Sequence, residues 1–329
     1  MIAFQPDRPR SVLVTGGAGF IGSHVVDALL AAGREVTVYD NLSAGRLDSL
    51  RHNLENPLFR FIEADLTNLD ALLDIMPGHD LIWHLGANGD IPGGFYNTEM
   101  DLRDNVIATR NVLEAMRQTG VRDLIFSSSG AVYGEDQKIP SPESAGPLLP
   151  ISLYAAAKIA CEAFVSAFCH LFGLNAWVFR FGNVLGRRMA RGVIYDFIQK
   201  LRENPEELII LGDGQQTKNY FLVEECIEGM LHAYYQVQLT PDKPCEIFNL
   251  GASENSDVIT IADIVIQEMG LKDVAKRCIG DSRGWPGDQP KVFLNVTKME
   301  RLGWRAKYSS DEAVHIAAGY LVAELGDRS

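Results

Sequence analysis

A glycine-rich stretch near the start of the chain constrains its fold more than any other feature. Residues 11–15, Ser-Val-Leu-Val-Thr, have the composition of a buried strand, and residues 23–32 carry apolar side chains at helical spacing. Between them stand Gly16, Gly17, Gly19 and Gly22. Glycines permit a tight turn and let the backbone approach a pyrophosphate, which the N–H groups at the start of a helix can bind. The stretch therefore predicts a strand, a phosphate-binding turn and a helix.

An acidic residue follows at the distance that a dinucleotide-binding unit requires. The next expected strand, residues 35–39, leads into Asp40, eighteen residues after Gly22. A carboxylate at this point can accept hydrogen bonds from the ribose hydroxyls of adenosine and would repel a 2′-phosphate. The combination favours NAD over NADP, with Arg46 as the residue that could weaken this preference. The alternative interpretation is an ordinary βα turn with an exposed aspartate.

Strands and helices continue to alternate up to residue 182, which predicts an α/β protein with a doubly wound parallel Rossmann sheet. After residue 182 the alternation changes, and we expect a smaller C-terminal α/β substrate lobe. We assign residues 1–182 to the NAD-binding domain and 183–329 to the substrate-binding lobe, with segments near 220–250 returning to the main domain. Ligands of such sheets bind at the carboxyl ends of the strands, where we expect several residues to converge. These are Ala18, Asp40, Asp65, Gly86, Ser129 and Asn183.

Composition narrows the possible partners. A formal net charge of −13 argues against nucleic acid as a partner. The sequence has no run of eighteen apolar residues, so we expect no membrane span. The five cysteines form no CxxC pair, so we expect free, buried thiols in a reducing cytoplasm. Since the seven histidines lack metal-binding spacing, we expect no metal site, and His84 is expected to be an interior histidine with hydrogen-bond partners. Residues 1–10 are predicted to be a frayed tail rather than a signal peptide.

Tyr154 and Lys158 are four residues apart on a helix expected from residue 154 to about 172, so they share one face. An ammonium group near a phenol should lower the pKa of the phenol toward neutrality. Such a tyrosine can take a proton from an alcohol while hydride leaves the same carbon. The spacing alone also fits a solvated helix face. Ser129, which follows an expected strand, favours the catalytic interpretation because its hydroxyl could share the substrate oxygen.

Further motifs extend this pattern from about residue 11 to residue 305. They are Thr15-Gly-Gly-Ala-Gly-Phe-Ile-Gly22, Asp40-Asn-Leu42, Ser127-Ser-Ser129, Tyr154-x-x-x-Lys158, Arg180-Phe-Gly-Asn-Val184, Gly212-Asp-Gly214 and Arg283-Gly-Trp-Pro-Gly-Asp288. Together they resemble the extended short-chain dehydrogenases/reductases. More closely, the chain is similar to the NAD-dependent nucleotide-sugar epimerases of the UDP-glucose 4-epimerase kind.

The resemblance implies a tightly bound NAD and assigns residues to three roles. The catalytic set is Tyr154 as the base, Lys158 on the nicotinamide ribose and Ser129 on the substrate hydroxyl. The cofactor-binding set is Gly16, Gly19, Phe20, Ile21, Gly22, Asp40, Asn41, Asp65, Leu66, Gly86, Ala87, Asn105, Ser127, Tyr154 and Lys158. The substrate-binding set is Ser129, Asn183, Lys218, Arg283 and Asp288, with Asn183 and Arg283 at the diphosphate and Asp288 near the nucleotide ribose.

The resemblance also implies a homodimer, in which the helix with Tyr154 and the expected helix 105–119 pair with their copies. An apolar face on the first of these helices agrees with this and could also be covered by the chain itself. It is formed by Phe164, Val165, Phe168 and Leu171.

The chain departs from the family pattern at three places. Lys218 stands where arginine is common, and Gly86 where alanine is usual. Gly130 and Ala131 replace the Asp-Glu pair that dehydratase relatives use to expel water. The leading hypothesis is 4-epimerisation of a UDP-sugar. The alternatives are another sugar-nucleotide enzyme, such as a UDP-glucuronate epimerase, a decarboxylase or a reductase, and a non-catalytic NAD-binding regulatory protein.

Overall fold

The structure is a computed structural model that describes residues 9–135 and 138–326. The predicted N-terminal tail lies largely outside this range. The chain divides into two compact units, which we describe separately. The first unit comprises Met1–Val132, Leu153–Arg180 and Met230–Phe248, and the second comprises Tyr133–Ser152, Phe181–Gly229 and Asn249–Ser329. Which unit binds cofactor and which binds substrate stays a prediction.

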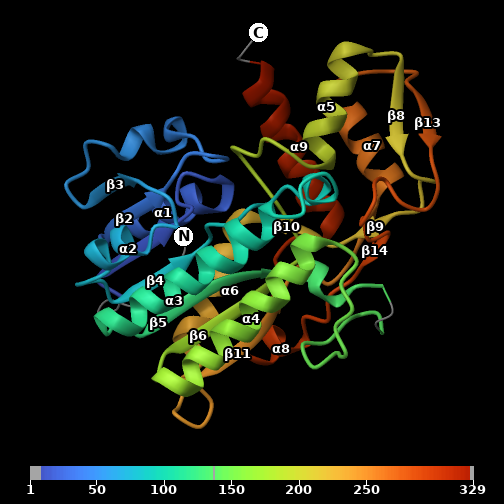
Figure 1. The fold of residues 1–329 in the computed structure, drawn as a ribbon. Helices are drawn as coiled ribbons and strands as arrows, with labels where there is room; N and C mark the ends of the chain where they lie inside the picture. The colour runs from blue at the N-terminus through green and yellow to red at the C-terminus, as the bar shows by residue number, and fades with distance from the viewer. Residues whose placement is uncertain (1–8, 136–137, 327–329) are drawn as a thin grey trace. The chain divides into compact units, whose positions relative to one another are not determined.

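A seven-stranded sheet forms the centre of the first unit, in the order β11-β6-β5-β4-β1-β2-β3 (Figure 1). Its strands are β1 Ser11–Thr15, β2 Glu35–Asp40, β3 Phe59–Glu63, β4 Leu81–His84, β5 Asp123–Ser129, β6 Asn175–Phe181 and β11 Cys245–Leu250. Strand β1 pairs in parallel with both β2 and β4, so the direction of winding reverses beside β1. Ligands bind at such a reversal in doubly wound sheets. The predicted Rossmann-type fold is confirmed.

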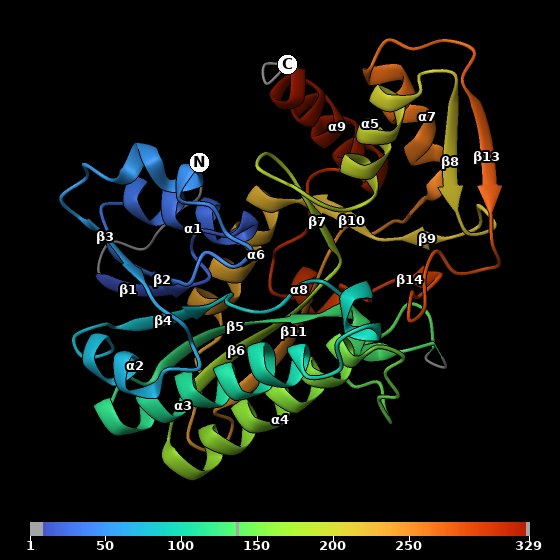
Figure 2. The same ribbon diagram turned by 45° about the horizontal axis from the view of Figure 1, so that its top comes forward.

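Helices cover both faces of this sheet. Helices α2 Leu69–Ile75, α3 Ala108–Thr119 and α4 Leu153–Phe172 lie on one face, and α1 Phe20–Ala31 lies on the other (Figure 2). Strand residues such as Leu13 and Leu124 form a core cluster with Val112 of α3 and Val165 of α4. By length and composition alone, α4 could cross a membrane. Part of its apolar surface lies in this core, to which α4 contributes Cys161, Val165 and Cys169.

The second unit contains smaller sheets and helices. Its strands are β7 Asn183–Leu185, β8 Glu207–Leu211, β9 Thr217–Lys218, β10 Tyr220–Leu222, β12 Ser256–Asp257, β13 Ala275–Ile279 and β14 Lys291–Val292. Its helices include α5 Val193–Glu203, α7 Val258–Glu268, α8 Thr297–Arg301 and α9 Ser310–Gly326, while α6 Val223–Gln236 belongs to both units. The N-cap of α7 is Asp257, whose carboxylate accepts a hydrogen bond from the Thr260 N–H.

Candidate active site

The glycine-rich turn joins β1 to α1 and is closed by its own backbone. Gly16 has a φ of +68°, and a Cβ on Gly22 would lie 2.1 Å from the Gly16 carbonyl oxygen. Any larger residue at either place would open the turn. The first turn of α1 carries no acidic side chain, so no negative charge competes with a pyrophosphate for its N–H groups. The turn therefore fits the pyrophosphate of a dinucleotide.

Asp40 fixes this turn as well as closing β2. One carboxylate oxygen accepts the Ala18 N–H at 2.9 Å and the other accepts the Leu42 N–H at 2.8 Å. Burial raises the pKa of Asp40, and these two hydrogen bonds act in the opposite direction. A carboxylate has about four acceptor sites, so it can still receive ribose hydroxyls. The geometry agrees with the predicted ribose contact.

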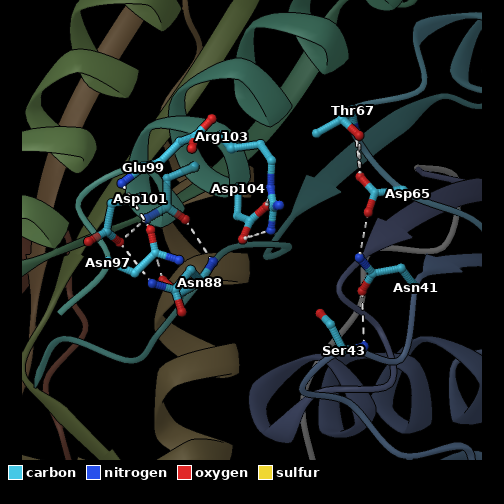
Figure 3. A network of polar contacts seen from close by, with 11 residues as sticks. Asn41, Ser43, Asp65, Thr67, Asn88, Asn97, Glu99, Asp101, Arg103 and Asp104 are labelled. Carbon is cyan, nitrogen blue, oxygen red and sulfur yellow. Dashed lines mark hydrogen bonds and ion pairs between the residues drawn. The ribbon is translucent and has the colours of Figure 1, made fainter. Parts of the chain in front are cut away.

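The neighbouring polar groups include Asn41 and Asp65 (Figure 3). The Asn41 amide donates to Asp65 Oδ2 at 2.8 Å, while the Thr67 hydroxyl and N–H donate to Asp65 Oδ1 at 2.6 and 2.8 Å. Burial raises the pKa of Asp65, but these hydrogen bonds outweigh it and leave the pKa below its ordinary value. Asp65 is thus held as an oriented carboxylate at the end of β3, where the resemblance places the adenine.

The end of β4 is held against the turn through His84. Its ring nitrogens contact the hydroxyls of Thr15 at 2.6 Å and Thr109 at 3.0 Å. Burial lowers the pKa of His84 to about 3, so the ring is neutral. The prediction of an interior histidine with partners is confirmed. Gly86 follows, and a Cβ on Gly16 would lie 2.6 Å from the Gly86 nitrogen, so these two loops pack backbone against backbone.

The three residues predicted to be catalytic lie together in the first unit. Ser129 is the last residue of β5 and hydrogen bonds to the phenol of Tyr154, the second residue of α4. One turn further, Lys158 is 3% exposed and donates to the Ser127 carbonyl oxygen at 2.8 Å. Its ammonium nitrogen lies 5.8 Å from the centroid of the Tyr154 ring. The base, its hydroxyl partner and the lysine thus form one cluster at the carboxyl end of β5.

The prediction that the pKa of Tyr154 is lowered is wrong for the protein without a bound cofactor. Burial raises the pKa of Tyr154 to about 12, and the hydrogen bond from Ser129 only partly opposes this. Asp101 and Cys161 raise the pKa of Tyr154 further. Burial also lowers the pKa of Lys158. Both groups are removed from water, and helical spacing alone does not reveal this cost.

A buried ion pair that sequence reasoning missed supports this cluster. Arg180 of β6 donates to both carboxylate oxygens of Glu162 at 2.9 and 2.7 Å, and the two side chains are 3% and 8% exposed. Ser128 donates to the same carboxylate at 2.5 Å. Since Ser128 lies between Ser127 and Ser129, the pair fixes the strand end that carries both predicted site residues. Glu162 stands four residues after Lys158 on the same helix, a signal the sequence did contain.

The helix expected from residue 105 begins with a wider turn. Residues 102–107 form a π-helical segment, η3 Leu102–Ile107, and α3 starts only at Ala108. Asn105 lies in this segment and is 1% exposed. Its side-chain oxygen accepts the Asn88 N–H at 2.7 Å, which ties the loop after β4 to η3. The structure thus places Asn105 beside the loop that contains Gly86 and Ala87.

The second unit gathers three predicted substrate residues. Lys218 donates to Asp288 Oδ1 at 2.6 Å, and Arg283 donates to the Asp288 carbonyl oxygen at 2.8 Å. Arg283 also forms a two-pronged ion pair with Glu135, with N–O distances of 2.6 and 2.7 Å. No residue of this set was predicted to pair with Glu135, because 148 positions separate it from Arg283. Two cations and two carboxylates therefore share one cluster.

Asn183 begins β7 in the same unit. Its backbone N–H and side-chain amide both donate to the Asn219 carbonyl oxygen, at 2.7 and 3.2 Å. Asn219 directly follows Lys218, so the pairing of β7 with β10 brings Asn183 to the end of the strand that carries Lys218. The second unit thus holds Asn183, Lys218, Arg283 and Asp288, and the first unit holds all the predicted cofactor residues.

Comparisons with known proteins agree with this geometry. A family model described as the NAD dependent epimerase/dehydratase family matches residues 12–251. The chain is 31% identical over 314 residues to a UDP-glucose 4-epimerase of Mycolicibacterium smegmatis, covering 92% of this chain and 95% of that protein. A solved UDP-galactose 4-epimerase is 39% identical, with a TM-score of 0.85 over 96% of this chain and 99% of that one.

A dTDP-glucose 4,6-dehydratase from Streptomyces venezuelae, solved as a double mutant with NAD and DAU bound, is 26% identical with a TM-score of 0.86, covering 96% and 98% of the two chains. The similarity thus extends beyond epimerases to a second reaction on nucleotide sugars. The family match nevertheless covers more than half of the chain. This chain belongs to the NAD-dependent epimerase/dehydratase family and is an enzyme with NAD as its cofactor.

Proposed function

We propose that this enzyme inverts the configuration at C4 of a UDP-sugar of the UDP-glucose/UDP-galactose type, through a transient 4-keto intermediate. One observation carries the proposal: the Ser129 hydroxyl hydrogen bonds to the Tyr154 phenol, with Lys158 one turn further along α4. This arrangement offers one proton acceptor and one hydroxyl to the same substrate oxygen. Such a pair serves oxidation and reduction of one carbon equally well, which inversion requires.

In this mechanism Tyr154 takes the proton of the C4 hydroxyl and later returns it to the ketone oxygen. Ser129 holds that oxygen in both directions. NAD, when bound, supplies the hydride acceptor and a positive charge near the phenol. The glycine-rich turn, Asp40 and Lys158 would hold it through its pyrophosphate and its two riboses. Because burial raises the pKa of Tyr154 to about 12 in the protein alone, the base depends on positive charge near the phenol to become active.

Residues beside the catalytic cluster argue for inversion rather than loss of water. Elimination needs an acid for the departing hydroxyl and a base for the proton next to the ketone. Gly130 and Ala131 follow Ser129 and can do neither. The first acidic residue after Ser129 in the sequence is Glu135, and it forms an ion pair with Arg283. These observations favour the epimerase over the dehydratase reaction of the Streptomyces relative.

The cationic cluster of the second unit supports a nucleoside diphosphate as the substrate handle. Arg283 would bind the diphosphate through its planar fork, Lys218 would add a second positive charge and Asn183 would add an amide donor. Asp288 would accept hydrogen bonds from the nucleotide ribose. Solved relatives include a UDP-galactose 4-epimerase, which agrees with uridine as the base.

Another sugar-nucleotide reaction is the alternative, and a panel of substrates separates it from C4 inversion. We expect UDP-glucose or UDP-galactose to be converted into its C4 epimer, as seen by chromatography, without added NAD. Denaturing the purified protein should release NAD. Conversion of UDP-glucuronate alone, or formation of a pentose or a 6-deoxy product, would replace the proposal. Released NAD with no conversion of any sugar would indicate a regulatory protein.

We also propose that the enzyme is a homodimer that pairs through α4 and the η3–α3 segment. Large apolar side chains are exposed there, with exposed fractions of 44% for Ile107, 40% for Phe164, 73% for Leu171 and 44% for Phe172. Val165, predicted on the same face, is completely buried in the core and cannot contribute. Light scattering at micromolar concentration should give twice the chain mass, and a monomer would overturn the proposal.

A further inference from the structure

One buried carboxylate beside the catalytic cluster has no part in the mechanism above. Asp101 is 1% exposed, and its Oδ1 accepts a hydrogen bond from the Asn88 amide at 2.9 Å (Figure 3). The same oxygen accepts a hydrogen bond from the Asn105 amide at 3.0 Å. Its Oδ2 is buried and has no hydrogen-bond partner among residues 9–135 and 138–326. Both partners of Oδ1 are neutral amides, so within the described part of the chain no cation is bonded to this carboxylate. A charge buried in this way is costly unless another charge compensates it.

The backbone around Asp101 leaves room for this free oxygen. Gly94 is buried, and a Cβ placed there would lie 2.7 Å from Asp101 Oδ2. A side chain at residue 94 would therefore push the carboxylate out of its place. Gly94 thus leaves space for Asp101 Oδ2, although this oxygen accepts no hydrogen bond from the described residues. We therefore attribute the role of this oxygen to the negative charge of the carboxylate and not to a hydrogen bond.

Asp101 is also connected to the turn of α4 that carries the lysine. It leads directly into η3, whose Asn105 carbonyl oxygen accepts a hydrogen bond from Cys161 Sγ at 3.4 Å. Cys161 stands three residues after Lys158. The Asp101–Asn105 bond thus holds the π-helical segment, a conformation often found at functional sites, against α4.

Glu162 also acts on Lys158, but its negative charge is already compensated by a buried arginine. The titratable groups that act on this pair are Cys161 and Glu162 from α4, His84 from β4, and Asp101. Both carboxylate oxygens of Glu162 accept hydrogen bonds from Arg180. His84 is neutral because burial lowers its pKa to about 3, and burial keeps Cys161 a thiol by raising its pKa. Asp101 remains as the carboxylate with no cation of its own.

We propose that Asp101 is a positioning residue of the catalytic pair: its carboxylate is the counter-charge of the Lys158 ammonium and fixes Asn88 and Asn105 beside it. The proposal rests on Tyr154 being the base of the proposed function. Asp101 and Lys158 act on each other electrostatically, with Asp90 and Asp104 as the further acidic groups that face Asp101. Among the described residues, Lys158 has a carbonyl oxygen as its hydrogen-bond partner, and a buried lysine bonded in this way needs a nearby negative charge to remain protonated.

The sign of the effect follows from the charge. A carboxylate near Tyr154 and Lys158 raises the pKa of both groups, because it disfavours the phenolate and favours the ammonium. Removing the charge should lower both values. The acid limb of the pH profile of kcat/KM, set by Tyr154, and the alkaline limb, set by Lys158, should therefore move together to lower pH.

The test compares the parent holoenzyme with Asp101→Asn and Asp101→Ser. Both variants remove the charge. Asparagine keeps an acceptor oxygen for the Asn105 amide, and serine is smaller, so one serves if the other does not fold. We expect the acid limb to fall by roughly one to two pH units, the size of a unit charge about 6–12 Å away at an effective dielectric constant of about 20. The near-ultraviolet absorbance of the phenolate, taken as the difference from Tyr154→Phe in each background, should show the same shift in the pKa of Tyr154.

Asp104→Asn is the matched control. Asp104 lies three residues further in η3, is partly exposed, and is bound by Arg103 at 2.6 Å. This variant loses the same charge and should leave both limbs in place. The inference would be overturned if neither the limbs of the pH profile nor the phenolate titration moved in the two Asp101 variants. It would also be overturned if they moved equally in Asp104→Asn. A phenolate shift in a protein that converts no nucleotide sugar would refute the proposed function and the catalytic part of the inference, while confirming that the Asp101 charge acts on Tyr154.

Discussion

Two ion pairs, one in each unit, differ in how deeply they are buried. In the first unit the Arg180–Glu162 pair is 3% and 8% exposed, and Lys158 is buried with a carbonyl oxygen as its hydrogen-bond partner. In the second unit the Arg283–Glu135 pair is 39% and 32% exposed. Buried pairs are rigid and costly to break, whereas exposed pairs exchange partners at little cost. We infer that the first unit is built in advance for a cofactor that stays, and the second for an anion that comes and goes.

Removing the phenol oxygen should have the largest effect. Tyr154→Phe keeps the ring packing but has no atom that can take the C4 proton. A general base contributes about 10²–10⁴-fold, so we expect kcat to fall by that factor while the NAD content stays that of the parent. Steady-state assays and the absorbance of released cofactor measure the two quantities. A rate within about threefold of the parent, far below this range, would remove Tyr154 from the mechanism.

The contrast between the two ion pairs can be tested through stability. Glu162→Ala leaves Arg180 buried without its partner, which costs about 3–5 kcal/mol of unfolding free energy. Glu135→Ala breaks an exposed pair and should cost less than about 1 kcal/mol. Denaturant unfolding of the two variants measures both values. Equal losses would mean that the two pairs do not differ as their burial suggests.

Arg283→Ala should raise KM for the nucleotide sugar by about tenfold or more, the size of one lost charge-assisted hydrogen bond, with kcat nearly unchanged. The diphosphate is remote from C4, so its contacts are the same in the ground and transition states.

The matched variant Glu135→Gln removes the competing carboxylate and keeps Arg283. We expect it to lower KM by a few fold, since an exposed pair is worth about 1 kcal/mol or less. A rise in KM for Glu135→Gln would show that Glu135 orients the arginine instead of competing for it. An unchanged KM for Arg283→Ala would mean that Arg283 only makes a surface ion pair.

Local sequence signals predicted the fold of the first unit, because each of its elements has a pattern of its own. The candidate site residues of this unit also lie on single elements: the glycine turn joins β1 to α1, Asp40 ends β2, and Tyr154 and Lys158 lie on α4. The partners that connect elements were not predicted. Glu135 pairs with Arg283 across 148 positions, and Asp101 follows an irregular loop and precedes a π-helical turn that has no sequence period of its own. The Tyr154 pKa was misjudged for a related reason, because burial depends on tertiary packing.

The fate of the hydrogen on C4 tests the central claim most directly. A UDP-sugar deuterated at C4 is incubated with the holoenzyme in ordinary water, and its unlabelled form is incubated in deuterated water. If Tyr154 serves both directions of one oxidation and reduction, the epimer keeps the deuterium at C4 and gains none at carbon from the solvent. A stable 4-keto-6-deoxy product, or solvent deuterium at C5, would contradict the account and identify the enzyme as a dehydratase.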